Sequence, residues 1–179
     1  VEPLGVGNIT DIFNGTYDGN YNTISWTFNL ENIPTSNSYR QYVSLFNILG
    51  TTAVVKNLKI NASFTGSLPV GATIALVTYE NRGTIQNVSL GNTGDRMEFS
   101  DRFNMYWYGV AQKNEGTITK VVNNYSVTMT HSTNITGISI GYAGITSVNN
   151  GTISQVANYG NIAVQTTRAT VAGIVGNNN

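Results

Sequence analysis

One phrase recurs three times in this chain, and each copy centres on the tripeptide Gly-Thr-Ile. The copies are 33 and 35 residues apart and begin at Gly83, Gly116 and Gly151. Three positions after each isoleucine stands a valine, at Val88, Val121 and Val156. A fixed period of about 20–50 residues is typical of a solenoid, in which each repeat buries its apolar face against its neighbours.

The composition of the repeat favours strands over helices. Gly, Asn, Thr, Ile and Val dominate it, and Gly and Asn are unfavourable inside helices. Segments such as 160–164 alternate polar and apolar residues, which is the period of a strand. Asn and Gly also accept positive φ and therefore suit corners. We predict an all-β fold, a right-handed parallel β-helix (solenoid) with short three-strand rungs and outward loops.

Equivalent residues of successive rungs should stack in columns, because neighbouring parallel strands lie about 4.8 Å apart. The predicted inward columns are Ile85, Ile118 and Ile153, and Val88, Val121 and Val156. Between the two columns the chain is expected to bend over two polar residues. Residues 53–58 form a degraded fourth copy, and 92–104 form the longest outward loop. Asparagines at corners are expected to stack as hydrogen-bonded ladders.

Two further phrases connect the chain to a known family. The segment 13–24 reads FNGTYDGNYNTI, 43–60 reads VSLFNILGTTAVVKNLKI, and 172–177 reads AGIVGN. They resemble the GLUG-repeat regions of bacterial and protist surface proteins, a filamentous-haemagglutinin-like class of parallel β-helix. The matching residues are Phe13, Gly15, Thr16, Asp18, Gly19, Asn20, Thr23, Ile24, Leu45, Phe46, Asn57, Leu58, Ile60 and Ala172 to Asn177.

The resemblance covers all but residues 31–42 and 92–104. It departs from the family at Asn22, where a glycine is usual, and in lacking the family's typical cysteine. It implies a stalk, an adhesin segment or a spacer. We expect one β-helix domain over residues 1–179, with divergent rungs over 1–60 and GLUG-like rungs over 61–179.

The two ends of the chain carry expectations of their own. It starts at Val1 without a signal-like apolar stretch, as a mature protein or a fragment would. The last residues, 170–179, stop midway through a rung. The coil is then continued either by a longer chain or by the N-terminal segment of another copy, so end-to-end self-association is the expected contact.

Charge and cysteine content narrow the function. Nine basic and nine acidic residues give a formal net charge of zero, which disfavours a nucleic-acid-binding face. The absence of cysteine excludes disulfides and thiolate metal sites. No apolar run reaches the length of about 20 residues that spans a bilayer, so membrane insertion is not expected.

Asn-x-Ser/Thr sequons are abundant and favour an extracellular or cell-surface protein with N-linked glycans. The candidate sites are Asn8, Asn14, Asn61, Asn87, Asn124, Asn134 and Asn150. The alternative is that these asparagines are turn residues that carry nothing.

Candidate catalytic chemistry is sparse. The acidic residues Asp95, Glu98 and Asp101 alternate with Arg96 and Arg102. Paired carboxylates can act as acid and base, but alternating charges are also typical of a solvated loop, which we favour. The aromatic run Tyr106, Trp107 and Tyr108 could stack on a sugar ring, or pack into the core and against the 92–104 loop.

Asp18 is expected to be a turn residue. His131 is the single histidine, so neither a zinc site nor a nucleophilic triad is expected. We predict no catalytic residue, metal or cofactor. The expected function is a non-catalytic extracellular structural protein, a stalk segment or a subunit of a head-to-tail fibre. The alternative is a carbohydrate-binding or polysaccharide-cleaving β-helix.

Overall fold

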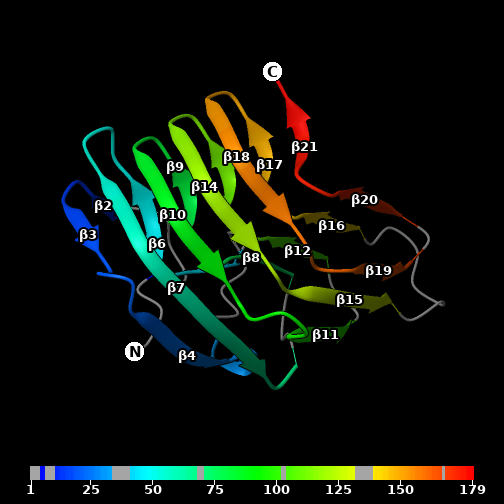
Figure 1. Ribbon diagram of the computed structural model, residues 1–179. Coiled ribbons are helices and arrows are strands. Elements are labelled where there is room, and N and C mark those ends of the chain that lie inside the picture. Colours follow the sequence, from blue (N-terminus) through cyan, green and yellow to red (C-terminus); the bar gives the residue numbers. More distant parts are fainter. Residues whose placement is uncertain are drawn as a thin grey trace.

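The computed structural model describes residues 5–6, 11–33, 41–67, 71–101, 104–131, 139–166 and 168–179. These residues coil into an all-β parallel solenoid of about four turns (Figure 1), which confirms the predicted fold class. The helical structure among them is one 3-10 turn, η1 (Leu30–Asn32). Every described strand pair is parallel, except that β1 runs antiparallel to β5.

Four sheets form the sides of the coil. Sheet A contains, in order, β1 (Gly5–Val6), β5 (Gln41–Ser44), β8 (Ala72–Ala75), β12 (Met105–Tyr108), β16 (Ile140–Ala143) and β20 (Ala169–Ala172). Sheet B contains β2 (Ile12–Phe13), β6 (Phe46–Leu49), β9 (Thr78–Asn81), β13 (Ala111–Asn114), β17 (Thr146–Asn149) and β21 (Val175–Asn178).

The other two sheets complete each turn. Sheet C contains β3 (Thr16–Asp18), β7 (Val54–Thr65), β10 (Thr84–Leu90), β14 (Thr117–Asn123) and β18 (Thr152–Asn158), with β4 (Thr23–Asn29) on the second half of β7. Sheet D contains β11 (Arg96–Asp101), β15 (Ser126–His131) and β19 (Ile162–Gln165).

The predicted columns lie side by side in sheet C. Ile118 of β14 pairs in register with Ile85 and Ile153, and Val121 pairs with Val88 and Val156. The degraded fourth copy is also in register, since Val55 stands beside Ile85 and Leu58 beside Val88. All of these side chains contribute to the hydrophobic core. The spacing of the repeat is therefore the length of one turn.

The bend between the two columns is smaller than expected. The isoleucine and the valine of a repeat lie on one continuous strand with two residues between them. The second of these two residues lies in the left-handed region, and the strand pairing skips it. These left-handed residues are Asn57, Asn87, Lys120 and Gln155, with φ between 52° and 54°. An extra residue of this kind shifts the alternation by one position, so both apolar side chains point inward.

Sheet D adds a fourth strand to the rungs that contain β10, β14 and β18. The segment 92–104 was expected to be an outward loop, but β11 lies within it and pairs with β15. Met97 and Phe99 point inward and are each 6% exposed, whereas Arg96 and Glu98 face solvent. Apolar and polar residues thus alternate with the period of a strand in a segment whose charges suggested a loop.

The two ends of the coil are closed to different degrees. At the N-terminal end, β4 and η1 bury Trp26, Phe28, Leu30 and Ile33. Asn29 caps η1 by accepting a hydrogen bond from the Glu31 amide at 3.1 Å. At the C-terminal end, the strands β18 to β21 contain exposed and half-buried residues throughout.

Candidate functional site

The most regular polar feature is a row of asparagine side chains at the corner where sheet B ends. Asn81 donates to Asn114, Asn114 donates to Asn149, and Asn149 donates to Asn178, each from Nδ2 to Oδ1 over 2.7 Å. Asn81 and Asn114 are 0% exposed. We call this row the B ladder. In each of these three bonds the donor lies on the rung nearer the N-terminus and the acceptor on the next rung toward the C-terminal end of the solenoid.

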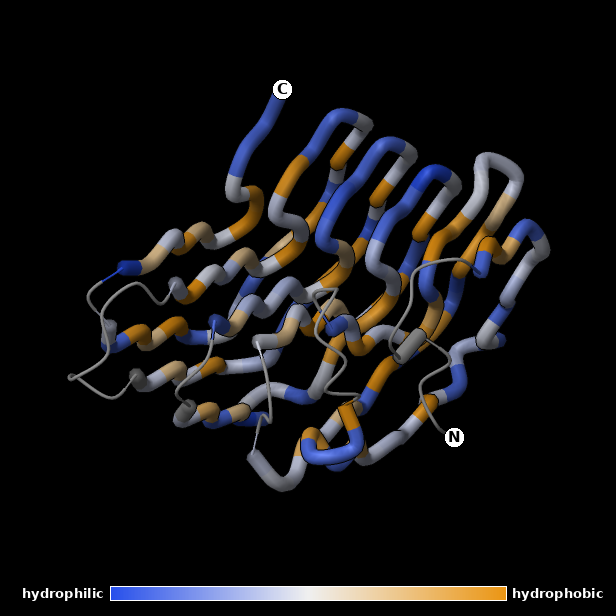
Figure 2. Tube along the Cα trace, turned by 180° about the vertical axis from the view of Figure 1, so that it is seen from behind, coloured by the Kyte–Doolittle hydropathy of each residue, from blue (hydrophilic) through white to orange (hydrophobic). Residues whose placement is uncertain are grey.

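The sequence contains a signal for this ladder. Asn81, Asn114 and Asn149 each precede the repeat glycine by two positions. The Oδ1 atom of Asn81 also accepts from the Gly83 amide at 3.2 Å, which holds the corner in place. Figure 2 shows hydrophilic residues gathered at the turns that lead from β13 to β14 and from β17 to β18, beside strands with apolar residues.

A shorter row, which we call the C ladder, lies where sheet C ends. Asn123 Nδ2 donates to Asn158 Oδ1 at 3.0 Å and to the Gly144 carbonyl at 3.0 Å. Toward the N-terminal end, its column continues as Leu90, Ile60 and Ile24. The B ladder column likewise continues as Leu49 and Phe13. Both columns are therefore apolar at the N-terminal end and end in amides at the other.

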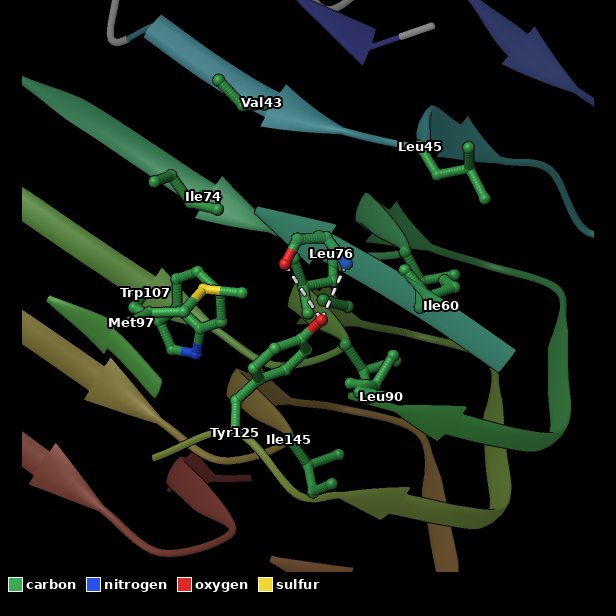
Figure 3. Packing of buried hydrophobic residues seen from close by; sticks show 14 of the residues in the cluster. Val43, Leu45, Ile60, Ile74, Leu76, Leu90, Met97, Trp107, Tyr125 and Ile145 are labelled. Carbon is green, nitrogen blue, oxygen red and sulfur yellow. Dashed lines mark hydrogen bonds between the residues drawn. The ribbon is translucent and has the colours of Figure 1, made fainter. Parts of the chain in front are cut away.

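Tyr125 closes a gap between β7 and sheet D. Strand β11 is an edge of sheet D and is not paired with β7. The Tyr125 hydroxyl, from the following turn, accepts from the Ala62 amide at 2.7 Å and donates to the Ala62 carbonyl at 3.0 Å (dashed lines in Figure 3). Asn61 Oδ1 lies 3.3 Å from the same oxygen. The Tyr125 side chain thus satisfies the backbone amide and carbonyl of Ala62 in β7, which a neighbouring strand would otherwise pair with.

Tyr125→Phe is expected to lower the free energy of unfolding by about 1–3 kcal/mol, because it leaves the buried backbone groups of Ala62 unsatisfied. Burial raises the pKa of Tyr125 to about 12, against the opposing hydrogen bond with Ala62, from an ordinary 10.0. A raised folded-state pKa contributes stability that is complete below pH 10 and is lost as the pH rises toward 12. Denaturant unfolding at pH 8 and pH 11 would measure both effects.

The matched control is Tyr159→Phe, because Tyr159 is 72% exposed. The Tyr159 variant should behave as the wild type at both pH values. The Tyr125 variant should lose less stability between pH 8 and pH 11 than the wild type does. It should still lose some stability over this range, because a second tyrosine is buried. Burial also raises the pKa of Tyr142 to about 12. Equal stability of the Tyr125 variant and the wild type at pH 8 would contradict a structural role for the hydroxyl.

A cluster of four charges spans two rungs at the start of the turns after sheet B. Glu80, 8% exposed, accepts two bonds of 3.1 Å from Arg82 and lies 3.5 Å from Lys113. Both cations also pair with Glu115. Burial raises the pKa of Glu80, but the hydrogen bonds and charges of Arg82 and Lys113 outweigh it and hold the pKa below the ordinary 4.5. These charges pair with one another across the rungs.

The structure separates the three rings of the aromatic run. Trp107 is 0% exposed and packs in the core, 6.1 Å from the ring of Tyr125, so of the two alternatives for this residue the structure shows core packing. Tyr108 is only 7% exposed and packs with Ala75 and Ala143 on the outer face of sheet A. Tyr106 is half-buried and stacks on Tyr108 with ring centroids 6.4 Å apart. Sugar stacking requires an open ring face, which Trp107 lacks.

The acidic residues do not form a described pair of carboxylates. Asp95 accepts from the backbone and side-chain nitrogens of Asn92 at 2.7 and 3.1 Å, which stabilises the turn before β11. Glu98 is exposed on the outer face of β11. The side chains of Asp101 and His131, and all of Arg102, lie outside the described residues. The described part of the chain holds no group of three or more His, Cys, Asp or Glu residues suited to a metal ion.

Asp18 was expected in a turn but is the last residue of β3, where it pairs with Lys56, and the turn begins after it. Its carboxylate accepts from the Asn20 amide at 2.9 Å and from Asn57 Nδ2 at 3.1 Å, and it pairs with Lys56 at 3.3 Å. The backbone hydrogen bond from Asn20 lowers the pKa of Asp18, as do Asn57 and Lys56. Asn57 in turn accepts from Asn87 Nδ2 at 2.9 Å, so a third stack of polar side chains follows the left-handed residues.

The sequon asparagines fall into two groups. Asn14 and Asn150 are exposed. The other described sequon asparagines, Asn61, Asn87 and Asn124, are half-buried. Asn61 makes a hydrogen bond with Tyr125, Asn87 with Asn57, and Asn124 with Gly91. Asn8 and Asn134 lie outside the described residues.

The end faces carry the apolar surface of the described chain. At the N-terminal end, a cavity of about 510 Å³ is lined by Asp11, Ile12, Phe13, Tyr17, Ile24, Leu45, Phe46 and Asn47. At the C-terminal end the core columns finish in partly exposed side chains: Ile153, Val156, Ile162, Val164 and Ile174. Val171 there is 48% exposed. Each face therefore offers apolar contacts to another layer.

The fold and these surfaces define the protein as a parallel β-solenoid. No family model, curated protein or solved structure matches the chain. Among the described residues, no helix has the length and hydropathy of a bilayer-spanning segment.

Proposed function

We propose that this chain is a non-catalytic structural segment of an extracellular stalk, whose length comes from stacked rungs. The proposal rests on the observation that polar side chains form hydrogen bonds and ion pairs between successive rungs. The B ladder, the C ladder and the Glu80 cluster all join one rung to the next. Such side chains reinforce a coil along its axis, which is the direction in which a stalk bears load.

The rival is a carbohydrate-binding or polysaccharide-cleaving β-helix that uses the outer face near Asp95 to Tyr108. The decisive experiment is a screen of the purified protein for glycan binding and polysaccharide cleavage. It is repeated with the triple variant Asp95→Ala, Glu98→Ala and Asp101→Ala. The stalk proposal expects no activity in either protein. Cleavage by the wild type that the triple variant loses would replace it with the enzymatic function.

Extracellular placement is supported by the sequons and is tested by their occupancy. Expressed through a secretory pathway, the chain should carry glycans at Asn14 and Asn150, because these side chains are exposed. Asn61, Asn87 and Asn124 should be empty, because their side chains are half-buried between rungs. The Nδ2 atoms of Asn87 and Asn124, to which a glycan would be attached, also donate hydrogen bonds to a neighbouring rung. Glycopeptide mass spectrometry measures each site. Full occupancy of Asn87 in folded protein would contradict the prediction.

In a second form of the proposal, copies of the chain stack head to tail into a fibre. Both end faces are apolar, which supports association through them. Val171→Lys places a charge at the end of an inward column, whereas Thr170→Lys places it on the outer face next to it. If this second form holds, sedimentation velocity and electron microscopy at increasing concentration will show assembly that only the Val171 variant abolishes. Dispersed monomers at all concentrations would exclude the fibre form.

A further inference from the structure

Both asparagine ladders end at the C-terminal face, which is formed by β18 to β21. The last member of the B ladder is Asn178, and the last member of the C ladder is Asn158. Within the B ladder, Asn149 Nδ2 donates to the Gly151 carbonyl at 3.2 Å as well as to Asn178. Asn178 accepts that bond, and its own Nδ2 has no partner among the described residues. Asn158 Nδ2 donates at 3.3 Å to the carbonyl of Gly160 in its own turn and has no ladder partner beyond it. Both rows thus present amide N–H groups at the C-terminal end of the coil. Figure 1 shows β18 to β21 at this end.

A glycine column gives a second, independent observation. A Cβ at Gly109 would lie 2.0 Å from the Gly144 carbonyl oxygen, and one at Gly144 would lie 2.0 Å from that of Gly173. At Gly109 and Gly144 the next rung on the C-terminal side therefore leaves no room for a side chain, whereas Leu76 occupies the equivalent position one rung earlier. Gly173 is the last member of the column, and a Cβ there would meet nothing within 4 Å. The φ angle of Gly173 is also outside the positive region. Within the described residues, neither steric crowding nor backbone conformation therefore requires glycine at this position.

The N-terminal face of a second copy does not complement these groups. Phe13 occupies the B ladder column at that face, and Ile24 occupies the C ladder column. Direct head-to-tail stacking would bury the amides of Asn178 and Asn158 against apolar side chains. A buried donor without an acceptor is costly, and this cost falls on two columns at once.

We infer that the C-terminal face binds a further rung of this repeat class, one that carries asparagine in both ladder columns, rather than the N-terminal face of a second copy. The inference rests on the proposed structural function and names the partner of its exposed end. The rung accepts from Asn178 and Asn158 through side-chain oxygens and places a backbone carbonyl over Gly173. Its apolar residues cover Ile153 and Val164.

The chain itself provides the probe. Asn178 and Asn179 bond to the residues 29 positions before them, Asn149 and Asn150. A second copy of residues 151–179 joined after Asn179 therefore continues the register by one full turn. The matched variant carries Asn158→Leu and Asn178→Leu in the added copy only. Hydrogen exchange of the original β18 and β21 amides reports whether the added rung stacks, with β10 amides as the internal reference.

The added asparagine rung should slow exchange in β18 and β21 by about tenfold or more relative to the leucine variant, since the latter leaves amides unpaired. Gly173→Ala in the original rung should leave the melting temperature of the unextended chain unchanged, yet abolish the protection given by the asparagine rung. Equal protection by both added rungs, no protection by either, or insensitivity to Gly173→Ala would each overturn the inference.

Failure of this inference is distinguishable from failure of the proposed function. If wild-type copies associate head to tail, and Val171→Lys but not Asn178→Leu prevents it, the structural function stands and the specificity for asparagine is overturned. Activity on a polysaccharide in the triple-alanine comparison would remove the structural function itself, whichever rung protects β18.

Discussion

Gly116→Ala is expected to lower the free energy of unfolding by about 3 kcal/mol, the cost of forcing atoms into a packed site. A Cβ at this position would lie 2.1 Å from the carbonyl oxygen of Gly83, the equivalent glycine of the preceding rung. That oxygen cannot move away freely, because it accepts a hydrogen bond from the Thr117 amide at 2.8 Å. The same collision arises at Gly151 against Gly116, which explains why the repeat keeps its glycine.

Denaturant-induced unfolding at neutral pH measures this effect. The control is Gly173→Ala, because it makes the same chemical change in the same solenoid where a Cβ would meet nothing within 4 Å. The control should change the stability by less than about 0.5 kcal/mol. A Gly116 variant as stable as the Gly173 variant would mean that the rungs are spaced more loosely than this register requires.

Asn114→Leu is expected to cost about 3 kcal/mol. Asn114 stands in the middle of the B ladder and is 0% exposed. Its loss removes the acceptor of Asn81 Nδ2 and the donor to Asn149 Oδ1, both at 2.7 Å. Asn81 Nδ2 keeps only a bond of 3.3 Å to the Thr117 carbonyl, and Asn149 Oδ1 keeps only a bond of 3.4 Å from the Gly151 amide. Each buried polar group that loses its shorter hydrogen bond costs about 1–3 kcal/mol, because leucine offers no replacement.

Asn81→Leu is the matched control, since it makes the same exchange at the bottom of the ladder, directly above Leu49. It removes one ladder bond instead of two, but it also removes the acceptor of the Gly83 amide at 3.2 Å. Its cost should therefore be lower than that of Asn114→Leu by the value of one ladder bond, about 1 kcal/mol. Thermal and denaturant unfolding compare the two variants. If both changes were equally mild, the ladder would be an ordinary row of corner residues and would not contribute to the cohesion of the rungs.

The columns of sheet C could be predicted because a solenoid converts spatial neighbours into a sequence period. Ile118 stacks between Ile85 and Ile153, so the distance along the chain between like residues equals one turn. The asparagine of the B ladder follows the same rule. Its position two residues before the repeat glycine recurs in each copy, and the expectation that corner asparagines stack is met there.

Features without a period were not predictable in the same way. Strand β11 lies in a charged segment, and its inward Met97 and Phe99 are too few to outweigh the charges around them. Tyr125 bonds to Ala62 across 63 residues, a separation that matches no single repeat. Trp107 stands between two tyrosines, and the sequence left open which of the three rings the core takes up.

The sequence by itself determined that this protein is a coil of parallel strands, because residues that repeat at one interval must stack when the chain turns at that interval. Only the tertiary structure decided the direction of the amide ladders and the difference between the two ends. Both depend on which neighbour each Asn178 or Phe13 side chain meets through space, and the order of residues along one rung does not specify that neighbour.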